Sequence, residues 1–145
     1  MKAVCIAIVL LSALSIIAQA SPHAGPRKLK LTVFMESKCR HFREAVHRSL
    51  GPGIEKGLLE MTDLEFVPYG NGKMERVPKK SRRLPRISCQ HGLDECKGNV
   101  IDNCFLKYAK DKKTGLRAVV CFATKFHKTH WFKAMNFCST KFGYN

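Results

Sequence analysis

The hydrophobic pattern predicts a strand, a helix and a second strand in the first half of the chain. Residues 29–35 are rich in β-branched and aromatic side chains, which favours a strand. Apolar residues then recur at helical spacing, and we expect this helix to stop at Gly51-Pro52-Gly53. Residues 64–67 form the second strand, closed by the turn signal Gly70-Asn71-Gly72. This order and spacing predict two parallel strands joined by a crossover helix.

The second half of the chain predicts helices that follow an exposed basic segment. Residues 73–86 hold seven basic residues, two prolines and one acidic residue, which is typical of an exposed loop or irregular hairpin. Helical periodicity then returns in three stretches, 99–110, 116–126 and 130–138. The predicted fold class is therefore α/β.

The first twenty residues predict a secretory signal peptide. Lys2 precedes an apolar run, and Ala18-Gln19-Ala20 offers small residues where a signal peptidase reads them. The run is shorter than the roughly 20 residues that span a bilayer, so we expect no membrane span. A buried N-terminal helix is the alternative. We divide the chain into a signal peptide at 1–20, a flexible leader at 21–28 and one domain at 29–145.

Composition narrows the class of protein. The chain has 145 residues and 26 Lys and Arg against 11 Asp and Glu, a formal net charge of +15. This length allows one domain, which excludes a two-domain enzyme. Because 45% of the residues are hydrophobic, the chain is not a disordered basic tail. The charge favours solubility and attraction to anionic surfaces.

Removal of residues 1–20 leaves an even number of cysteines. In an exported chain this predicts a disulfide framework, although spacing alone leaves the pairing open. The six cysteines are Cys39, Cys89, Cys96, Cys104, Cys121 and Cys138.

Cys39 is the first candidate for chemistry. It lies where the predicted strand ends and the helix begins, so the helix dipole points at its sulfur. Lys38, Arg40, His41 and Arg43 add positive charge around it. Both effects favour the thiolate, which is the species that attacks a disulfide. The alternative is that Cys39 is one half of a structural disulfide.

A second cysteine-rich segment, residues 89–104, carries a specific spacing. It reads Cys-Gln-His-Gly-x-x-Glu-Cys-x-x-Asn-x-x-x-x-Cys and resembles the signature of the gamma-interferon-inducible lysosomal thiol reductase (GILT) family. The matching residues are Cys89, Gln90, His91, Gly92, Glu95, Cys96, Asn99 and Cys104. The resemblance extends over residues 29–138, essentially the whole mature chain.

The resemblance implies a thioredoxin-like βαβ core with a helical, disulfide-bonded insertion. It also implies reduction of protein disulfides at acidic pH, with disulfide-containing proteins as substrates, no cofactor, and a secreted or lysosomal location. Cys39 would be the nucleophile, and Arg40 and His41 would tune it electrostatically. The family cysteines expected in disulfides are Cys89, Cys96, Cys104, Cys121 and Cys138.

Two departures from the family pattern change the expected mechanism. Phe42 stands where the family has a second active-site cysteine or serine, so no internal thiol resolves a mixed disulfide. Its place on the apolar stripe predicts that Phe42 is buried instead. The chain also stops before the last two strands and closing helix of a thioredoxin-like fold, so we expect a truncated fold that reduces or isomerises disulfides through a single cysteine.

The basic segment leaves three alternatives open: a solvated loop, a site for an anionic polysaccharide or microbial surface, and a proteolytic processing site. No aromatic residues are interleaved with the charges, so we expect no nucleic-acid binding. The alternative function is a non-enzymatic, secreted cationic binding or defence protein on the same scaffold. The candidate anion-binding residues are Lys79, Lys80, Arg82, Arg83 and Arg86.

A zinc site is the last alternative for the signature. His91 with Cys89, Cys96 and Cys104 lacks the Cys-x2-4-Cys spacing of a zinc knuckle. An exported chain also favours disulfides over metal ligation, so we expect no metal.

Overall fold

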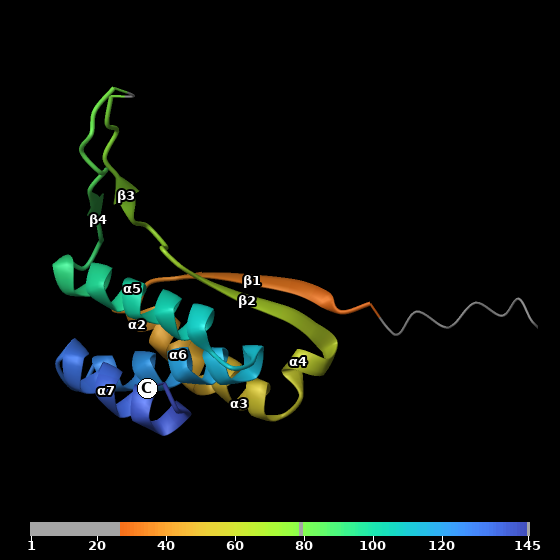
Figure 1. Ribbon diagram of the computed structural model, residues 1–145. Helices are drawn as coiled ribbons and strands as arrows, with labels where there is room; N and C mark the ends of the chain where they lie inside the picture. The colour runs from red at the N-terminus through yellow and green to blue at the C-terminus, as the bar shows by residue number, and fades with distance from the viewer. Residues whose placement is uncertain (1–26, 79, 145) are drawn as a thin grey trace, which may run out of the picture.

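The computed structural model describes residues 27–78 and 80–144, so the predicted signal peptide lies outside the described residues (Figure 1). Strand β1 (Leu29–Met35) pairs in parallel with β2 (Thr62–Pro68), in a register that runs from Leu29 opposite Thr62 to Met35 opposite Pro68. The prediction of an α/β class with two parallel strands is confirmed. Within the described ranges, no helix combines the length and the apolar character needed to cross a membrane.

The crossover between the strands is one nearly continuous helical segment. It consists of α2 (Arg40–Ala45), a π-helical turn η1 (Val46–Leu50), α3 (Gly51–Glu55) and the short α4 (Leu58–Met61). The expectation that the helix stops at Gly51-Pro52-Gly53 is wrong. The Gly51 N–H donates to the Val46 carbonyl in the wider π spacing, and Pro52 falls in the first turn of α3, where no helical N–H is needed.

Three longer helices follow the strands: α5 (Leu93–Tyr108), α6 (Lys112–Phe126) and α7 (Trp131–Phe142). The first two begin earlier than expected, and α5 includes most of the cysteine-rich signature. The early start of α6 has a local cause, because the Asp111 carboxylate accepts the Thr114 N–H at 2.8 Å and caps the helix.

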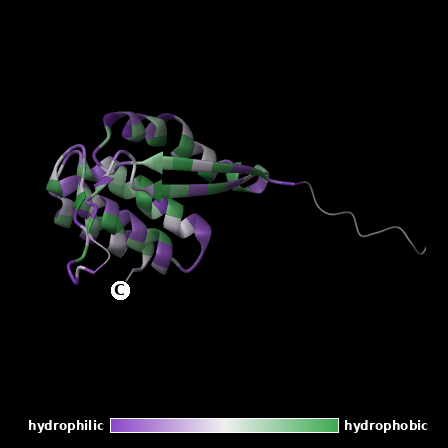
Figure 2. Cartoon of the chain, turned by 90° about the horizontal axis from the view of Figure 1, so that it is seen from above, coloured by the Kyte–Doolittle hydropathy of each residue, from purple (hydrophilic) through white to green (hydrophobic). Residues whose placement is uncertain are grey.

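The core lies between the inner face of the sheet and these helices. Leu64 and Phe66 of β2 are buried there together with Val119 and Phe122 of α6. Figure 2 shows helical segments on both sides of the strands, with hydrophobic and hydrophilic residues alternating along them. The outer face of the sheet is polar or exposed, since Lys30 pairs in register with Asp63. The helices therefore cover one face of the sheet.

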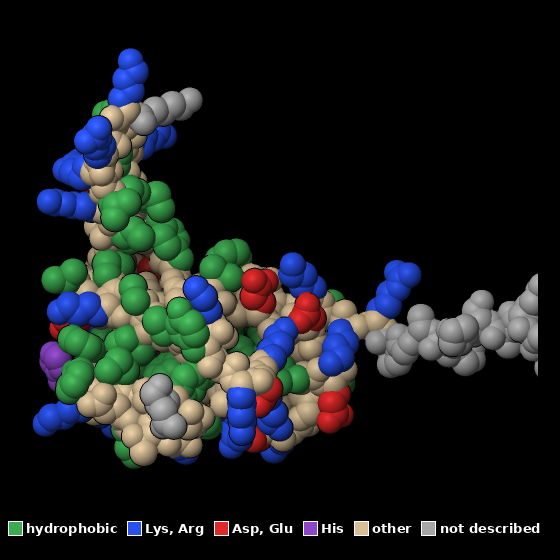
Figure 3. Space-filling view, viewed as in Figure 1, with side chains coloured by type: hydrophobic (Ala, Val, Ile, Leu, Met, Phe, Trp, Pro, Cys, Tyr) green, Lys and Arg blue, Asp and Glu red, His purple; other side chains and the backbone are tan. Residues whose placement is uncertain are grey.

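A hairpin projects from this body, and we call residues 73–88 the basic arm (Figure 1). Its antiparallel strands are β3 (Lys73–Met74) and β4 (Ile87–Ser88), extended by a hydrogen bond from the Glu75 N–H to the Arg86 carbonyl at 2.8 Å. Nearly all of its described residues are exposed, and Lys and Arg side chains crowd its outer part (Figure 3). The prediction of an exposed, irregular hairpin is confirmed.

Candidate functional site

Cys39 lies at the edge of the sheet where both parallel strands end. Glu36, Ser37 and Lys38 connect the end of β1 to it, and Cys39 is the extended residue that precedes α2. Its N–H donates to the Glu36 carbonyl at 3.0 Å, which closes a tight turn. Cys39 is half-buried and not disulfide-bonded. The predicted position at a strand-to-helix boundary is therefore confirmed.

The basic residues around Cys39 point in different directions. Arg40 is 76% exposed and pairs with Glu44 at 3.1 Å, so part of its charge is balanced along the helix. His41 is exposed, whereas Lys38 and Arg43 are half-buried. The local environment is positive on the side that Lys38 and Arg43 occupy.

Phe42 is turned into the core. It is 7% exposed, and its ring meets that of Phe66 edge-on with centroids 5.8 Å apart. Burial of this packed aromatic side chain confirms what the apolar stripe predicts for Phe42.

Two buried carboxylates and one imidazole lie together next to the turn that precedes Cys39. The Glu95 carboxylate on α5 has no solvent exposure, and it accepts the His91 backbone N–H at 3.0 Å and contacts His91 Nδ1 at 2.5 Å. Glu36 is also buried, and its second oxygen lies 3.6 Å from the same Nδ1. The 2.5 Å contact between Nδ1 and the Glu95 oxygen is a hydrogen bond. This arrangement ties the loop after β1 to the first turn of α5.

Ser37 is held by the same helix. Its N–H donates to the Asn99 Oδ1 at 2.9 Å, and its hydroxyl donates to the Glu95 carbonyl at 3.0 Å, both in buried positions. This close approach depends on Gly98, because a Cβ there would collide with the Ser37 side chain and the Phe126 ring. Ser37, two positions before Cys39, is thus fixed by two buried hydrogen bonds.

The remaining signature residues close the neck of the basic arm. Asn71, just before the arm, donates its N–H to Glu36 Oε1 at 2.6 Å and its side-chain amide to Gln90 Oε1 at 2.8 Å. Cys89 and Cys96 form a disulfide that joins the end of the arm to α5. Gly92 has a φ of 84°, which favours glycine at the turn into α5. We call this group the signature brace: Glu36, Ser37, Asn71, Gln90, His91, Glu95 and Asn99.

The disulfides differ from the expectation at one cysteine. Cys89 pairs with Cys96, and Cys121 pairs with Cys138, which links α6 to α7. Cys104 was also expected to be bonded, but it is a free and exposed thiol, so that prediction is corrected. The reason is geometric, because Cys104 lies five residues beyond Asn99. At about 100° per residue, that places it about 140° around α5 from the side that contacts Ser37.

A sequence profile of the family described as "Gamma interferon inducible lysosomal thiol reductase (GILT)" matches residues 30–142. The chain belongs to the GILT family. A "Gamma-interferon-responsive lysosomal thiol protein" of Arabidopsis thaliana is 33% identical over 94 residues, which cover 65% of this chain and 37% of the relative. "GILT-like protein 2" of Drosophila melanogaster is 31% identical over 100 residues, which cover 67% of this chain and 44% of the relative.

A third relative in the GILT family also aligns with this chain over only part of its own length. The "Gamma-interferon-inducible lysosomal thiol reductase" of Carassius auratus is 36% identical over 77 residues, which cover 53% of this chain and 29% of the relative. This GILT-family chain therefore spans less than half the length of these three curated relatives.

Three residues of the signature brace had no role assigned from sequence: Glu36, Ser37 and Asn71. The available signal is positional, since each directly follows the end of a strand or its turn, where polar residues of parallel strands meet at one edge. Their contacts give the GILT signature a physical role, which is to hold the loop that carries Cys39.

The same cluster is the candidate metal site among the described residues. Ligand atoms of Glu36, His91 and Glu95 all lie within 4.8 Å of one another. The 2.5 Å between His91 Nδ1 and the Glu95 oxygen is the length of a hydrogen bond. Two atoms bound to one tetrahedral zinc ion lie about 3.3 Å apart. The arrangement is therefore that of a hydrogen-bonded pair.

Two further groups have shifted pKa values: the fully buried Asp102 of α5 and the half-buried His127. Both Asp102 carboxylate oxygens lack hydrogen-bond partners, and complete burial raises the pKa of Asp102 well above its usual value. Burial, followed by the positive charges of Arg43 and Lys38, holds the pKa of His127 below its ordinary value. Both shifts favour the uncharged form of the side chain.

The predicted anion-binding residues lie on the basic arm, apart from Lys79, which lies outside the described residues. Lys80, Arg82, Arg83 and Arg86 are all exposed. Of these, Arg83 pairs with Glu75 at 2.6 Å. The others carry their charges into solvent.

Proposed function

We propose that this GILT-family chain exchanges protein disulfides through Cys39 as a single attacking thiolate. The observation that carries the proposal is the combination of a free, half-buried Cys39 and the buried brace that fixes the loop before it. A nucleophile held by its supporting residues loses less entropy when it reacts than one on a mobile loop.

The reaction has two steps. The Cys39 thiolate attacks one sulfur of a substrate disulfide, a Cys39–substrate disulfide forms, and the other substrate sulfur leaves as a thiolate. A second substrate thiolate then attacks the substrate sulfur of this mixed disulfide, which rearranges the substrate disulfide and releases Cys39. Alternatively an external thiol attacks, and net reduction then consumes two external thiols for each substrate disulfide.

The packing supports resolution from outside the chain. Phe42 fills the position of the second active-site thiol, and Cys104 faces away from the Ser37 side of α5. We therefore expect isomerisation and mixed-disulfide formation to be more efficient than net reduction.

The family also supports the finer parts of the proposal. We take the βαβ unit as a thioredoxin-like core, and we take Arg40 and His41 as the residues that tune Cys39 electrostatically. Disulfide-containing proteins are the proposed substrates, and the secretory pathway or the lysosome is the proposed location, since relatives bear lysosomal names.

A cationic binding protein on the same scaffold is the second candidate, and the exposed basic arm favours it. The two functions differ in one requirement. Disulfide exchange needs the Cys39 sulfur, whereas binding through the arm does not.

The deciding experiment compares Cys39→Ser with Cys104→Ser, because these are the two free cysteines among the described residues. Insulin-disulfide cleavage and alkylation by iodoacetamide would be measured across pH 4 to 9, with the labelled cysteine located by mass spectrometry. We expect Cys39→Ser to abolish cleavage and Cys104→Ser to leave it unchanged. Undiminished cleavage by Cys39→Ser contradicts the proposal.

A gain-of-function variant sharpens this test. Phe42→Cys restores a second thiol to the family position, so net reduction per enzyme should rise while isomerisation changes little. Loss of the packed ring should also cost about 3 kcal/mol of stability, so turnover is measured below the unfolding transition. Phe42→Ala gives the same loss of packing without the thiol. If it raises turnover equally, greater access and not resolution is the cause.

A further inference from the structure

The basic arm begins and ends beside Cys39. Its first root, Asn71, donates to the Glu36 carboxylate at 2.6 Å, and the Glu36 carbonyl accepts the Cys39 N–H at 3.0 Å. Its second root, Cys89, is bonded to Cys96 on α5. Parallel strands end at the same edge of a sheet, so the segment after β2 leaves the body where the segment after β1 places the nucleophile.

The arm carries a dense charge of one sign. Residues 73–86 contain seven basic residues and one acidic residue, a net charge of +6 from 7 − 1. Its acidic residue, Glu75, is already paired with Arg83. Among the described residues, Arg76, Lys80, Arg82 and Arg86 form no ion pair, so they are available to an acidic partner.

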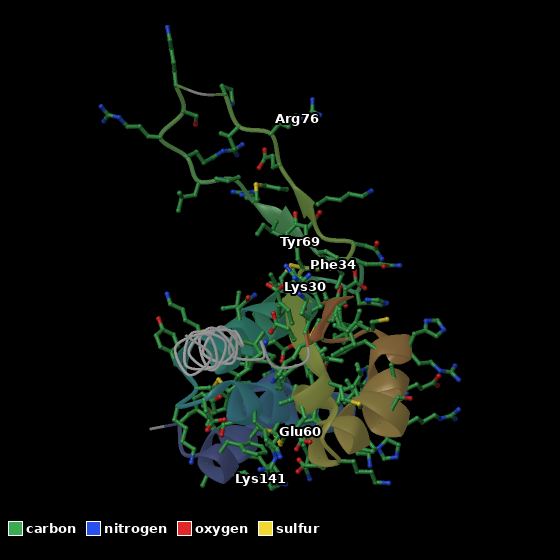
Figure 4. All side chains as sticks on the ribbon, turned by 90° about the vertical axis from the view of Figure 1, so that its right-hand side faces the viewer. Lys30, Phe34, Glu60, Tyr69, Arg76 and Lys141 are labelled. Carbon is green, nitrogen blue, oxygen red and sulfur yellow. A yellow bond between two sulfur atoms is a disulfide. The ribbon has the colours of Figure 1, made fainter. Side chains whose placement is uncertain are left out.

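Apolar side chains are interspersed with these charges. Leu84 is 82% exposed, and Met74 and Ile87 are also exposed on the arm. Figure 3 shows hydrophobic side chains where the arm meets the body, and Figure 4 places Phe34 and Tyr69 there, with Arg76 further out. Exposed aliphatic side chains beside positive charges suit a polypeptide partner, because protein interfaces combine an apolar centre with a charged rim.

We propose that the basic arm is a docking surface for an acidic, partly apolar stretch of a polypeptide substrate, whose disulfide it presents to Cys39. This inference rests on the proposed function and names the substrate class of the same site. Opposite charges raise the rate of encounter and fix orientation, and the arm's roots place the captured chain at the nucleophile.

The binding test uses the full mature chain with Cys39→Ser, so that no exchange occurs. The probes are two fluorescent, cysteine-free peptides of about eight residues: one alternates Glu with Leu, and the other alternates Lys with Leu. The arm variant is Arg76→Gln, Lys80→Gln, Arg82→Gln and Arg86→Gln. The matched control removes four exposed lysines at the far end of the sheet: Lys56→Gln, Lys107→Gln, Lys110→Gln and Lys113→Gln.

Both variants lower the net charge by four, so the total charge is matched while the place of the removed charge differs. We expect the acidic peptide to bind the parent chain and the arm variant to bind it about tenfold more weakly. The control should change affinity less than about twofold, and raised salt should weaken binding to the parent chain. Equal weakening in both variants would show that net charge, and not the arm, attracts the peptide.

Kinetics then separate this inference from the proposed function. With Cys39 present, disulfide-linked acidic and basic peptides are compared, and the arm variant should lose its preference for the acidic substrate at an unchanged rate of Cys39 alkylation. If no substrate is cleaved but the acidic peptide still binds through the arm, the proposed function fails and the docking surface stands. Arm-dependent binding of a heparin oligosaccharide or of phosphatidylserine vesicles, without peptide binding, overturns the assignment to a polypeptide.

Discussion

The signature brace and the basic arm are neighbours in the chain, yet opposite forces shape them. The brace joins the loop before Cys39 to α5 through hydrogen bonds made by buried residues, and its Glu95 carboxylate is fully buried. The arm has two short strands, few internal contacts and almost no burial. The arm joins the rest of the molecule at Asn71, which belongs to the brace, and at Cys89, which is bonded to Cys96.

The difference shows where a polar residue is constrained and where it is free. A buried carboxylate without its partner costs a large desolvation free energy, so each brace residue depends on the others. An exposed guanidinium is solvated with or without a partner, so individual arm charges matter little to folding. Substitutions in the brace should therefore alter stability and the Cys39 loop together, and substitutions in the arm should alter binding alone.

The largest expected effect is removal of the brace carboxylate. Glu95→Ala leaves the His91 N–H and imidazole without their buried acceptor, and we expect it to lower the free energy of unfolding by about 3 kcal/mol. Urea denaturation measures this change. Asp94→Ala is the matched control, because Asp94 lies one residue away on α5 and makes an exposed pair with Lys97. Equal losses from both variants would show that the brace is no more constrained than the surface.

The next prediction tests the buried Asp102 of α5 through the pH dependence of the free energy of unfolding. The pKa of Asp102 is raised by burial, so the folded chain holds this proton more tightly than the unfolded chain does. Its contribution is complete below the ordinary pKa and is lost as pH rises through the folded value, by about 1.4 kcal/mol per pH unit.

We therefore expect Asp102→Asn to match the parent chain at the ordinary pKa of Asp and below, and to exceed its stability as pH rises above that value. Thermal unfolding across this range checks the sign. For comparison, hydrogen bonds from the Thr114 backbone and side chain lower the pKa of Asp111, so its contribution is lost as pH falls. If the parent chain and Asp102→Asn keep a constant difference at all pH values, Asp102 does not titrate as its burial requires.

The smallest effect belongs to the arm. Glu75 and Arg83 form its internal ion pair, and their side chains are 40% and 53% exposed. We expect Arg83→Ala to change the free energy of unfolding by about 0.5 kcal/mol or less, with a further decrease at high salt. A double-mutant cycle with Glu75→Ala isolates the pair. A coupling above about 1 kcal/mol would mean that the arm is a folded structural element and that the contrast with the brace fails.

The sequence by itself determined the features that depend on near neighbours. Runs of β-branched and aromatic residues and the helical period placed the parallel strands and the crossover, and the apolar stripe put Phe42 in the core. The spacing from Cys89 to Cys104 identified the family before any contact was known. The strand and helix patterns on either side of Cys39 also placed this residue at a strand-to-helix boundary.

Tertiary structure decided what joins distant parts of the chain. Ser37 meets Asn99 across 62 residues, and Glu36 meets Asn71 across 35, and neither partner follows from local periodicity. Cys104 is free because it lies on a side of α5 that does not face the loop before Cys39. The local sequence Gly51-Pro52-Gly53 predicts that the helix stops, but a π turn carries the helix past Pro52. Local patterns report the preferences of a segment, whereas these contacts depend on how segments pack, because a buried polar group has to find its partner in the folded chain.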